Sequence, residues 1–80
     1  MAYQTLNKLK WTGKLNKSKV IILHRGAPED RKIIPGKDIT EVHKHYFLYK
    51  TSDDSEETLI PMHRILEIEL DGKTIWKKSK

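Results

Sequence analysis

The sequence contains the same dipeptide twice, at His24-Arg25 and at His63-Arg64. An arginine guanidinium can form two parallel hydrogen bonds to phosphate oxygens. A nearby histidine can donate a further hydrogen bond or transfer a proton. The first dipeptide ends a predicted strand before a turn, and the second follows Pro61 and begins another strand. If the two strands are neighbours, the dipeptides can converge on one phosphate.

Structural roles would also explain the second dipeptide. His63 could satisfy backbone groups of a loop, and Arg64 could pair with Glu67 or Asp71. The two readings, structural and phosphate-binding, remain open on spacing alone.

The residues after this dipeptide have the period of a strand with one wet face. Leu66, Ile68 and Leu70 alternate with two glutamates, a pattern typical of a half-buried strand. The same alternation would place Arg64 on the buried side and Ile65 outside. Because arginine is rarely buried without a partner, either the backbone turns between residues 61 and 65 or Arg64 lies at the rim of the core.

The sequence has few other patterns that carry chemistry. His43 and His45 are two residues apart and could reach one ligand from a strand, but no third ligand lies at a diagnostic spacing. Glycine-rich phosphate loops, serine-nucleophile elbows and cysteines are absent. We therefore predict no metal, no cofactor and no catalytic residue.

Length and composition indicate one domain, residues 1–80, with a small core. The absence of cysteine favours a reducing compartment. No apolar run approaches the roughly 18 residues of a membrane span, and the N-terminus lacks the apolar region of a signal peptide. We expect a cytoplasmic protein that does not enter a membrane.

The charge is unevenly distributed. The chain has 16 basic and 11 acidic residues, a net charge of +5. Basic residues collect near both ends, at Lys8, Lys10, Lys14, Lys17 and Lys19 and at Lys77, Lys78 and Lys80, and acidic residues collect at 53–57. This distribution suggests an anionic partner such as nucleic acid, although charged surface is also normal for a soluble domain.

The pattern of elements predicts an α+β domain, with a short N-terminal helix and about five strands in a curved antiparallel sheet or small open barrel. The helix covers Tyr3–Leu9, and Asp71-Gly72 predicts a type I′ hairpin turn. At most one helical turn is expected at Asp38–Glu41 from its capping-box pattern, and an exposed acidic loop at Thr51–Glu57. The predicted strands cover 19–25, 31–34 and 45–50, a last strand region that begins at 58–60 and includes 66–70, and the run at 73–76 after the turn.

The aromatic residues are predicted mainly to pack in the core. Trp11 follows the helix, and we expect it to pack rather than to stack on a base. Tyr46, Tyr49 and Trp76 could stack a nucleobase, but core packing is favoured for each.

Several segments resemble a family of small domains that occur as short archaeal proteins and fused to RNA-processing domains. A role in recognising RNA cyclic-group ends has been proposed for that family. The most specific segment is Ile60-Pro61-Met62-His63-Arg64-Ile65, and the others are Leu6–Trp11, His24–Pro28, Ile34–Ile39 and Asp71–Trp76.

The resemblance implies binding to RNA ends that carry a 2′,3′-cyclic phosphate, in RNA repair or processing, with an RNA-processing protein as a further partner. By matching position, His63 and Arg64 would contact the terminal phosphate and Arg25 would be a second cation. The family often has an arginine after the tryptophan, where this chain has Lys77 and Lys78. Lysine offers a point charge instead of a fork.

We therefore predict a non-enzymatic module that binds RNA ends. His63, Arg64, Arg25 and His24 would bind phosphate, with Lys8, Lys10 and Lys77 adding salt-sensitive attraction. Two alternatives stay open. One is a protein-interaction adaptor that uses strand edges or the acidic loop. The other is a cyclic phosphodiesterase with His63 and His24 as acid and base.

Overall fold

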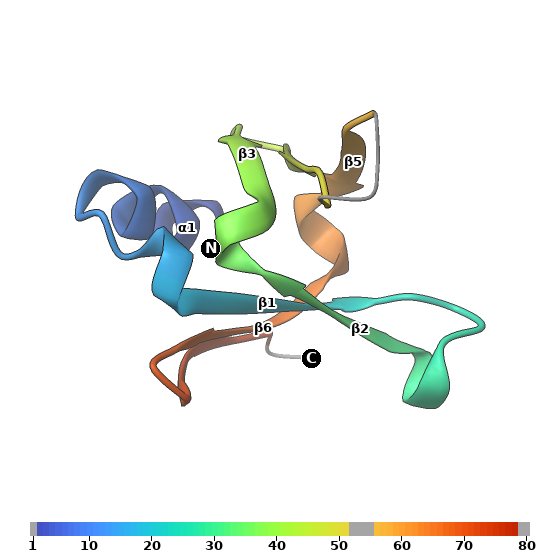
Figure 1. Cartoon of the computed structure of the whole chain (residues 1–80). Coiled ribbons are helices and arrows are strands. Elements are labelled where there is room, and N and C mark those ends of the chain that lie inside the picture. The colour runs from blue at the N-terminus through green and yellow to red at the C-terminus, as the bar shows by residue number, and fades with distance from the viewer. Residues whose placement is uncertain (1, 52–55, 79–80) are drawn as a thin grey trace.

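The computed structural model describes residues 2–51 and 56–78, which form one helix and two antiparallel sheets (Figure 1). The larger sheet has the strand order β2-β1-β6-β7 and the smaller has the order β3-β4-β5. The elements are α1 (Ala2–Trp11), β1 (Ser18–Leu23), β2 (Arg31–Pro35), β3 (Ile39–Val42), β4 (Tyr46–Tyr49), β5 (Thr58–Pro61), β6 (Ile65–Leu70) and β7 (Lys73–Lys77). In the described part of the chain, no helix has the length and hydrophobicity needed to cross a membrane.

The α+β class is confirmed, but the prediction had too few strands and placed them in a single sheet. Four strands and three strands form separate sheets, where about five strands in one sheet were expected. Within residues 2–51 and 56–78, each sheet keeps two free edges and the strands do not close into a barrel.

The predicted helix is confirmed and is longer at both ends. Ala2, Leu6 and Leu9 form its buried face. After Trp11 the helix ends at Gly13, whose φ of 72° is left-handed. The Gly13 N–H donates to Lys10 O at 3.3 Å, and the next N–H donates to Leu9 O at 2.9 Å. This pair of bonds is a Schellman motif, which fixes the helix end.

The core lies between the larger sheet, α1 and the smaller sheet. β1 is central in the larger sheet, as its continuous apolar run predicted. Seven side chains are less than 2% exposed: Phe47, Leu6, Ile22, Ile34, Ile65, Ile68 and Val20. They come from all three layers, so this small core depends on both sheets and the helix together.

The buried side of β6 begins one residue earlier than predicted and does not alternate strictly. Ile65 and Ile68 are both 0% exposed, whereas Leu66 is only half-buried. Ile21 pairs with Glu67 but Ile22 pairs with Ile65, so the register shifts at this point. Such a bulge moves side chains to the other face of a strand. The prediction that Leu66 faces the core was therefore wrong.

The chain crosses between the sheets at two similar corners. We call Pro35–Ile39 the first corner and Pro61–Ile65 the second corner. Each begins with an extended proline at φ −61°, continues with one 3-10 turn and ends at an extended isoleucine. In both, the isoleucine N–H donates to the carbonyl three residues earlier, that of Gly36 or Met62.

The second corner resolves the position of Arg64. The backbone turns at Met62–Arg64, as one of the two sequence-based explanations required, and Arg64 is exposed. At the first corner, the predicted helical turn at Asp38–Glu41 is wrong. The turn lies at Gly36–Asp38, and β3 begins at Ile39. The backbone groups of β3 pair with β4, and this pairing takes the place of the capped helical turn that was expected.

The predicted Asp71-Gly72 turn is confirmed. Asp71 and Gly72 have φ of 52° and 84°, which a type I′ turn requires at its two central residues. A register shift in the β6-β7 pair places Trp76 opposite Ile68, on the core side. Ile75 is left 44% exposed.

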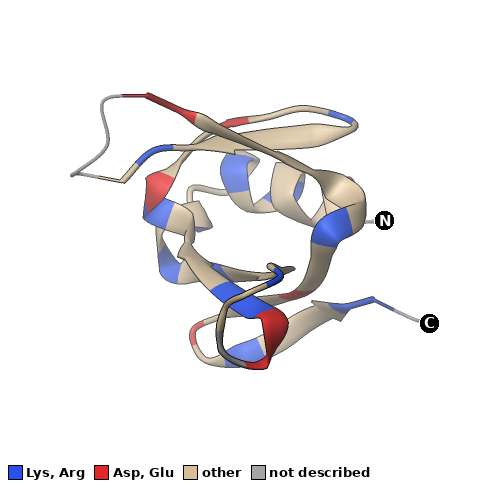
Figure 2. Cartoon of the chain, turned by 90° about the vertical axis from the view of Figure 1, so that its right-hand side faces the viewer, with Lys and Arg blue, Asp and Glu red and all other residues tan. Residues whose placement is uncertain are grey.

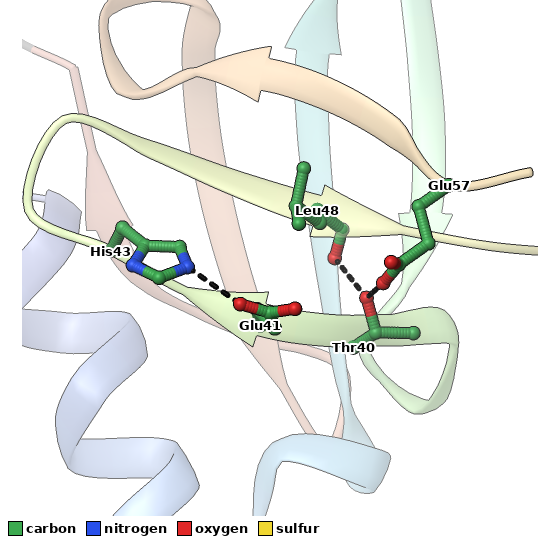
Figure 3. Close-up of polar contacts among 5 residues, drawn as sticks. All are labelled: Thr40, Glu41, His43, Leu48 and Glu57. Atoms are coloured by element: carbon green, nitrogen blue, oxygen red, sulfur yellow. Dashed lines mark hydrogen bonds and ion pairs between the residues drawn. The ribbon is translucent and has the colours of Figure 1, made fainter.

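Polar contacts link the strands of the smaller sheet. The Thr40 hydroxyl on β3 contacts the Leu48 carbonyl on β4 at 3.3 Å and the Glu57 carboxylate before β5 (Figure 3). The predicted acidic loop at 51–57 lies largely outside the described residues, because 52–55 are not described. Glu57 is exposed at its end.

Candidate functional site

Two neighbouring pockets lie on either side of the second corner. The larger pocket has a volume of about 570 Å³ and the smaller pocket about 330 Å³. The larger pocket is lined by Ala2, Tyr3, Lys44, His45, Met62, His63, Ile65, Trp76, Lys77 and Lys78. The smaller pocket is lined by Leu23, His24, Arg25 and Arg64.

The larger pocket is assembled from four parts of the chain: the start of α1, the turn between β3 and β4, the second corner and the end of β7. Two hydrogen bonds hold these parts together. The Met62 N–H donates to His45 O at 2.9 Å. The Lys78 ammonium donates to His63 O at 2.7 Å. Lys78 is thereby fixed beside the corner.

The side chains of the larger pocket favour an anionic ligand with a flat ring. Two histidines and three lysines line it, and its described lining includes no aspartate or glutamate. Concentrated positive charge in a concave site attracts anions. Tyr3 and Trp76 add aromatic surface that can stack on a base. The combination suits a nucleotide with its phosphate.

The smaller pocket brings two arginines together. β1 and β6 are neighbours, with Ile22 opposite Ile65, so the residues beyond β1 lie near those before β6. Among the described residues, neither Arg25 nor Arg64 forms an ion pair. Two unpaired guanidinium groups around one pocket are suited to a phosphate.

The two dipeptides converge only in part. His24, Arg25 and Arg64 line the smaller pocket, as neighbouring strands predicted, but His63 lines the larger one. Convergence of all four residues on a single phosphate stays a prediction, and in this structure they line two pockets. The expected acid–base pair is divided in the same way, because His24 lines the smaller pocket and His63 the larger one.

The structural reading of the second dipeptide is not supported in the described part of the chain. The ion pair of Glu67 is with Arg31, at 3.7 Å, and not with Arg64. The His63 side chain makes no hydrogen bond to a described loop residue, and only its carbonyl accepts one. Both side chains are thus available to a ligand.

The predicted lysines are divided between the pocket and the helix. Lys77 lines the larger pocket, whereas Lys8 and Lys10 lie exposed on α1 and line neither pocket. The charged residues of α1 are lysines, and the helix contains no aspartate or glutamate (Figure 2).

The predicted pair of histidines at 43 and 45 diverges. The His43 Nε2 lies 2.8 Å from a Glu41 carboxylate oxygen (Figure 3), and its ring stacks on Tyr46 with centroids 4.6 Å apart. His45 instead lines the larger pocket. Across residues 2–51 and 56–78, no three metal-ligating side chains form a group that could hold an ion.

The aromatic predictions have mixed outcomes. Tyr49 is buried, and its hydroxyl accepts a hydrogen bond from the Lys32 ammonium at 3.0 Å. Trp76 is half-buried, packs against the core and also lines the larger pocket. Trp11 was expected to pack but is 82% exposed. The spacing of α1 explains this error, because Trp11 lies on the side opposite Leu6 and Leu9.

The sequence-based interpretation missed Tyr3, Lys44 and Lys78 as pocket residues and gave His45 a different role. Their convergence depends on contacts between distant parts of the chain, such as that of His45 with Met62 and that of Lys78 with His63, for which the sequence has no local signal. One signal was present: the spacing Ile-Pro-X-X-X-Ile occurs twice, at 34–39 and at 60–65. It marks the two corners.

A family model described as the MJ1316 RNA cyclic group end recognition domain matches residues 1–78. The chain belongs to this family. The resemblance of the motifs is thereby confirmed over nearly the whole length. Since the second corner and both dipeptides lie within the matched residues, the two pockets are built from parts of this domain.

The chain is similar to UPF0248 proteins, which come mostly from archaea. One from Thermococcus sibiricus is 40% identical over 78 residues, covering 94% of this chain and 82% of the relative. UPF0248 protein MJ1316 of Methanocaldococcus jannaschii is 38% identical, covering 99% and 95%. UPF0248 protein PAE2518 of Pyrobaculum aerophilum is 35% identical, covering 96% and 97%. No solved structure matches the chain.

Proposed function

We propose that this protein binds RNA ends and distinguishes a 2′,3′-cyclic phosphate from other end groups. The observation that carries the proposal is the larger pocket, in which two histidines, three lysines and two aromatic rings meet without a described acidic side chain. Membership of a family described by RNA cyclic group end recognition supports the same ligand.

The two pockets would contact different parts of the RNA. The terminal nucleotide would occupy the larger pocket, where Tyr3 or Trp76 stacks on the base and His63 and Lys77 reach the end phosphate. Arg25 and Arg64 would bind a backbone phosphate in the smaller pocket. This division replaces the single phosphate site expected from the two dipeptides.

The cellular role would follow from the end group. Cyclic phosphates mark cleaved RNA, so a domain that recognises them would serve RNA repair or processing, together with a processing enzyme as protein partner. We also propose a cytoplasmic location, since the sequence has no cysteine for the disulfides common in oxidising compartments.

A binding titration tests the proposal. Fluorescent RNAs of one sequence would differ only in the 3′ end, which is a cyclic phosphate, an open phosphate or a hydroxyl. We expect the tightest binding for the cyclic end and weaker binding of all three at higher salt. His63→Ala should remove the preference between ends, whereas Arg64→Ala should weaken all three about equally, by roughly tenfold for one charged hydrogen bond.

Lys73→Ala provides a matched control, because Lys73 is an exposed lysine that lines neither pocket. It should bind like the wild type. Equal, salt-sensitive binding of all three ends would reduce the site to a general basic patch. Absence of binding at low salt would contradict the RNA proposal and favour a protein-interaction adaptor.

A second candidate function is hydrolysis of the cyclic phosphate. It is favoured by the presence of His45 and His63 in one pocket, which replaces the His24–His63 pair expected earlier. One imidazole would take a proton from water as its oxygen attacks phosphorus, and the other would protonate the ribose oxygen that leaves. Mass spectrometry of the RNA after the titration decides this: a gain of one water, lost in His45→Ala, would establish an enzyme.

A further inference from the structure

We propose that α1 carries a second RNA contact, in which Trp11 stacks on a base upstream of the terminal nucleotide. This inference rests on the proposed function, because it extends the strand bound in the larger pocket. Trp11 is 82% exposed, the highest value among the exposed large hydrophobic residues of the described chain. Neither pocket includes it.

The side chain is displayed on a fixed support. The Schellman motif at Gly13 and the Thr12 hydroxyl, which donates to Lys8 O at 2.8 Å, close the helix directly after Trp11. The opposite face of α1 is anchored in the core by Leu6 and Leu9. A rigid aromatic ring loses little conformational entropy when a base stacks on it.

The charge around Trp11 selects the kind of partner. The first 28 residues contain no aspartate or glutamate. Lys8, Lys10 and Lys14 are exposed and close to Trp11 along the chain. An aromatic ring among lysines suits a single strand of nucleic acid, whose bases stack while its phosphates pair with cations. An apolar partner would not require the lysines.

The helix connects Trp11 with the larger pocket. Tyr3 lines that pocket, and Tyr3, Asn7 and Trp11 follow at intervals of four residues. At 3.6 residues per turn, Tyr3 and Trp11 point within about 80° of each other, and eight residues span about 12 Å. At the rise of about 3.4 Å per stacked nucleotide, this distance corresponds to roughly three or four nucleotides. A strand that leaves the pocket along α1 would reach Trp11.

The length of the RNA tests this inference. The full chain is titrated with cyclic-ended RNAs of two, four, six and eight nucleotides. We expect affinity to rise up to about six nucleotides and then to level off. Trp11→Ala should weaken the six-nucleotide RNA about tenfold, within the usual range for one base stack, and leave the dinucleotide unchanged. Trp11→Phe should retain most of the affinity.

Ile33→Ala is the matched control, since Ile33 is an exposed apolar residue on the edge strand β2. It should not change binding at any length. Quenching of tryptophan fluorescence by iodide gives a second readout that does not need a weakened variant. The Trp11 signal, obtained by subtracting the signal of Trp11→Phe, should be protected by the six-nucleotide RNA and not by the dinucleotide.

The outcomes separate this inference from the proposed function. If the six-nucleotide RNA binds equally with all three ends and Trp11→Ala still weakens it, the helix contact stands and end recognition fails. If the cyclic end is preferred but affinity does not change with length, the helix contact is overturned. An equal effect of Trp11→Ala on the dinucleotide also overturns it, and so does no RNA binding at all.

Discussion

The two corners have the same backbone but differ in what surrounds them. Each takes an Ile-Pro pair out of one sheet, makes one 3-10 turn and delivers an isoleucine to the other sheet. Their proline dihedrals are nearly equal, with ψ of 136° and 142°. The geometry therefore does not depend on the three residues between proline and isoleucine.

The first corner is packed against its neighbours. Gly36 is buried, and a Cβ there would lie 1.9 Å from Leu15 O and 2.3 Å from the Ser18 hydroxyl oxygen. The Ser18 hydroxyl already donates to Leu15 O at 2.6 Å. No space remains for a side chain or a ligand at the start of this turn, so its role is to hold β2 and β3 in place.

The second corner faces open space on two sides. Met62 is half-buried, and His63 and Arg64 are exposed toward different pockets. The comparison indicates that one structural device is used twice, once for packing and once to present side chains to a ligand. The difference lies in the three middle residues and in what covers them.

The largest expected effect is on stability, from Gly36→Ala in the first corner. The new methyl group meets backbone, which cannot move aside, so we expect a loss of about 3 kcal/mol in the free energy of unfolding. Met62→Ala, the equivalent position of the second corner, should cost about 1 kcal/mol because Met62 is only half-buried. Urea unfolding measures both. Equal losses would contradict the contrast between the corners.

The next largest expected effect is on RNA binding. It is tested by placing residues of the first corner at the equivalent positions of the second corner. A double variant with His63→Lys and Arg64→Asp gives the second corner the two residues that follow Gly36. Because the first corner folds with them, we expect stability to change by less than about 1 kcal/mol. RNA affinity should fall about a hundredfold, since a phosphate-binding guanidinium is replaced by a carboxylate. Fluorescence titration and thermal unfolding follow the two properties.

Lys37→Ala is the control for that variant, because Lys37 occupies in the first corner the position of His63 in the second. It should leave RNA affinity and stability near wild type. Unfolding of the double variant, with normal binding per folded molecule, would return His63 and Arg64 to a structural role.

The smallest expected effect tests whether Glu67 interacts with Arg64 as well as with Arg31. Glu67 pairs with Arg31 at 3.7 Å on the surface of the larger sheet. The Arg31 side chain is 53% exposed and that of Glu67 20%. Ion pairs at the surface contribute about 0.2–1 kcal/mol, so Glu67→Gln should lower stability by roughly 0.5 kcal/mol. RNA affinity should stay the same or rise slightly. A marked change in the effect of Arg64→Ala in the Glu67→Gln background would show that the two residues are coupled after all.

Local patterns predicted those elements whose residues interact with near neighbours in the sequence. The helix at α1 and the hairpin at Asp71-Gly72 follow from short-range rules of spacing and backbone dihedrals. The bulge at Leu66 could not be predicted in this way. It arises because Ile65 and Ile68 must both face the core opposite β1, a requirement set by a strand more than 40 residues away in the sequence.

The same distinction applies to the candidate site. The sequence alone determined the dipeptides, the basic N-terminal segment, the absence of cysteine and the family motifs. Only the tertiary structure decided that His63 and Arg64 face different pockets and that His45 joins His63. The physical reason is that residue type is a local property. Which side chains share a pocket depends on how two sheets and a helix bury one small core.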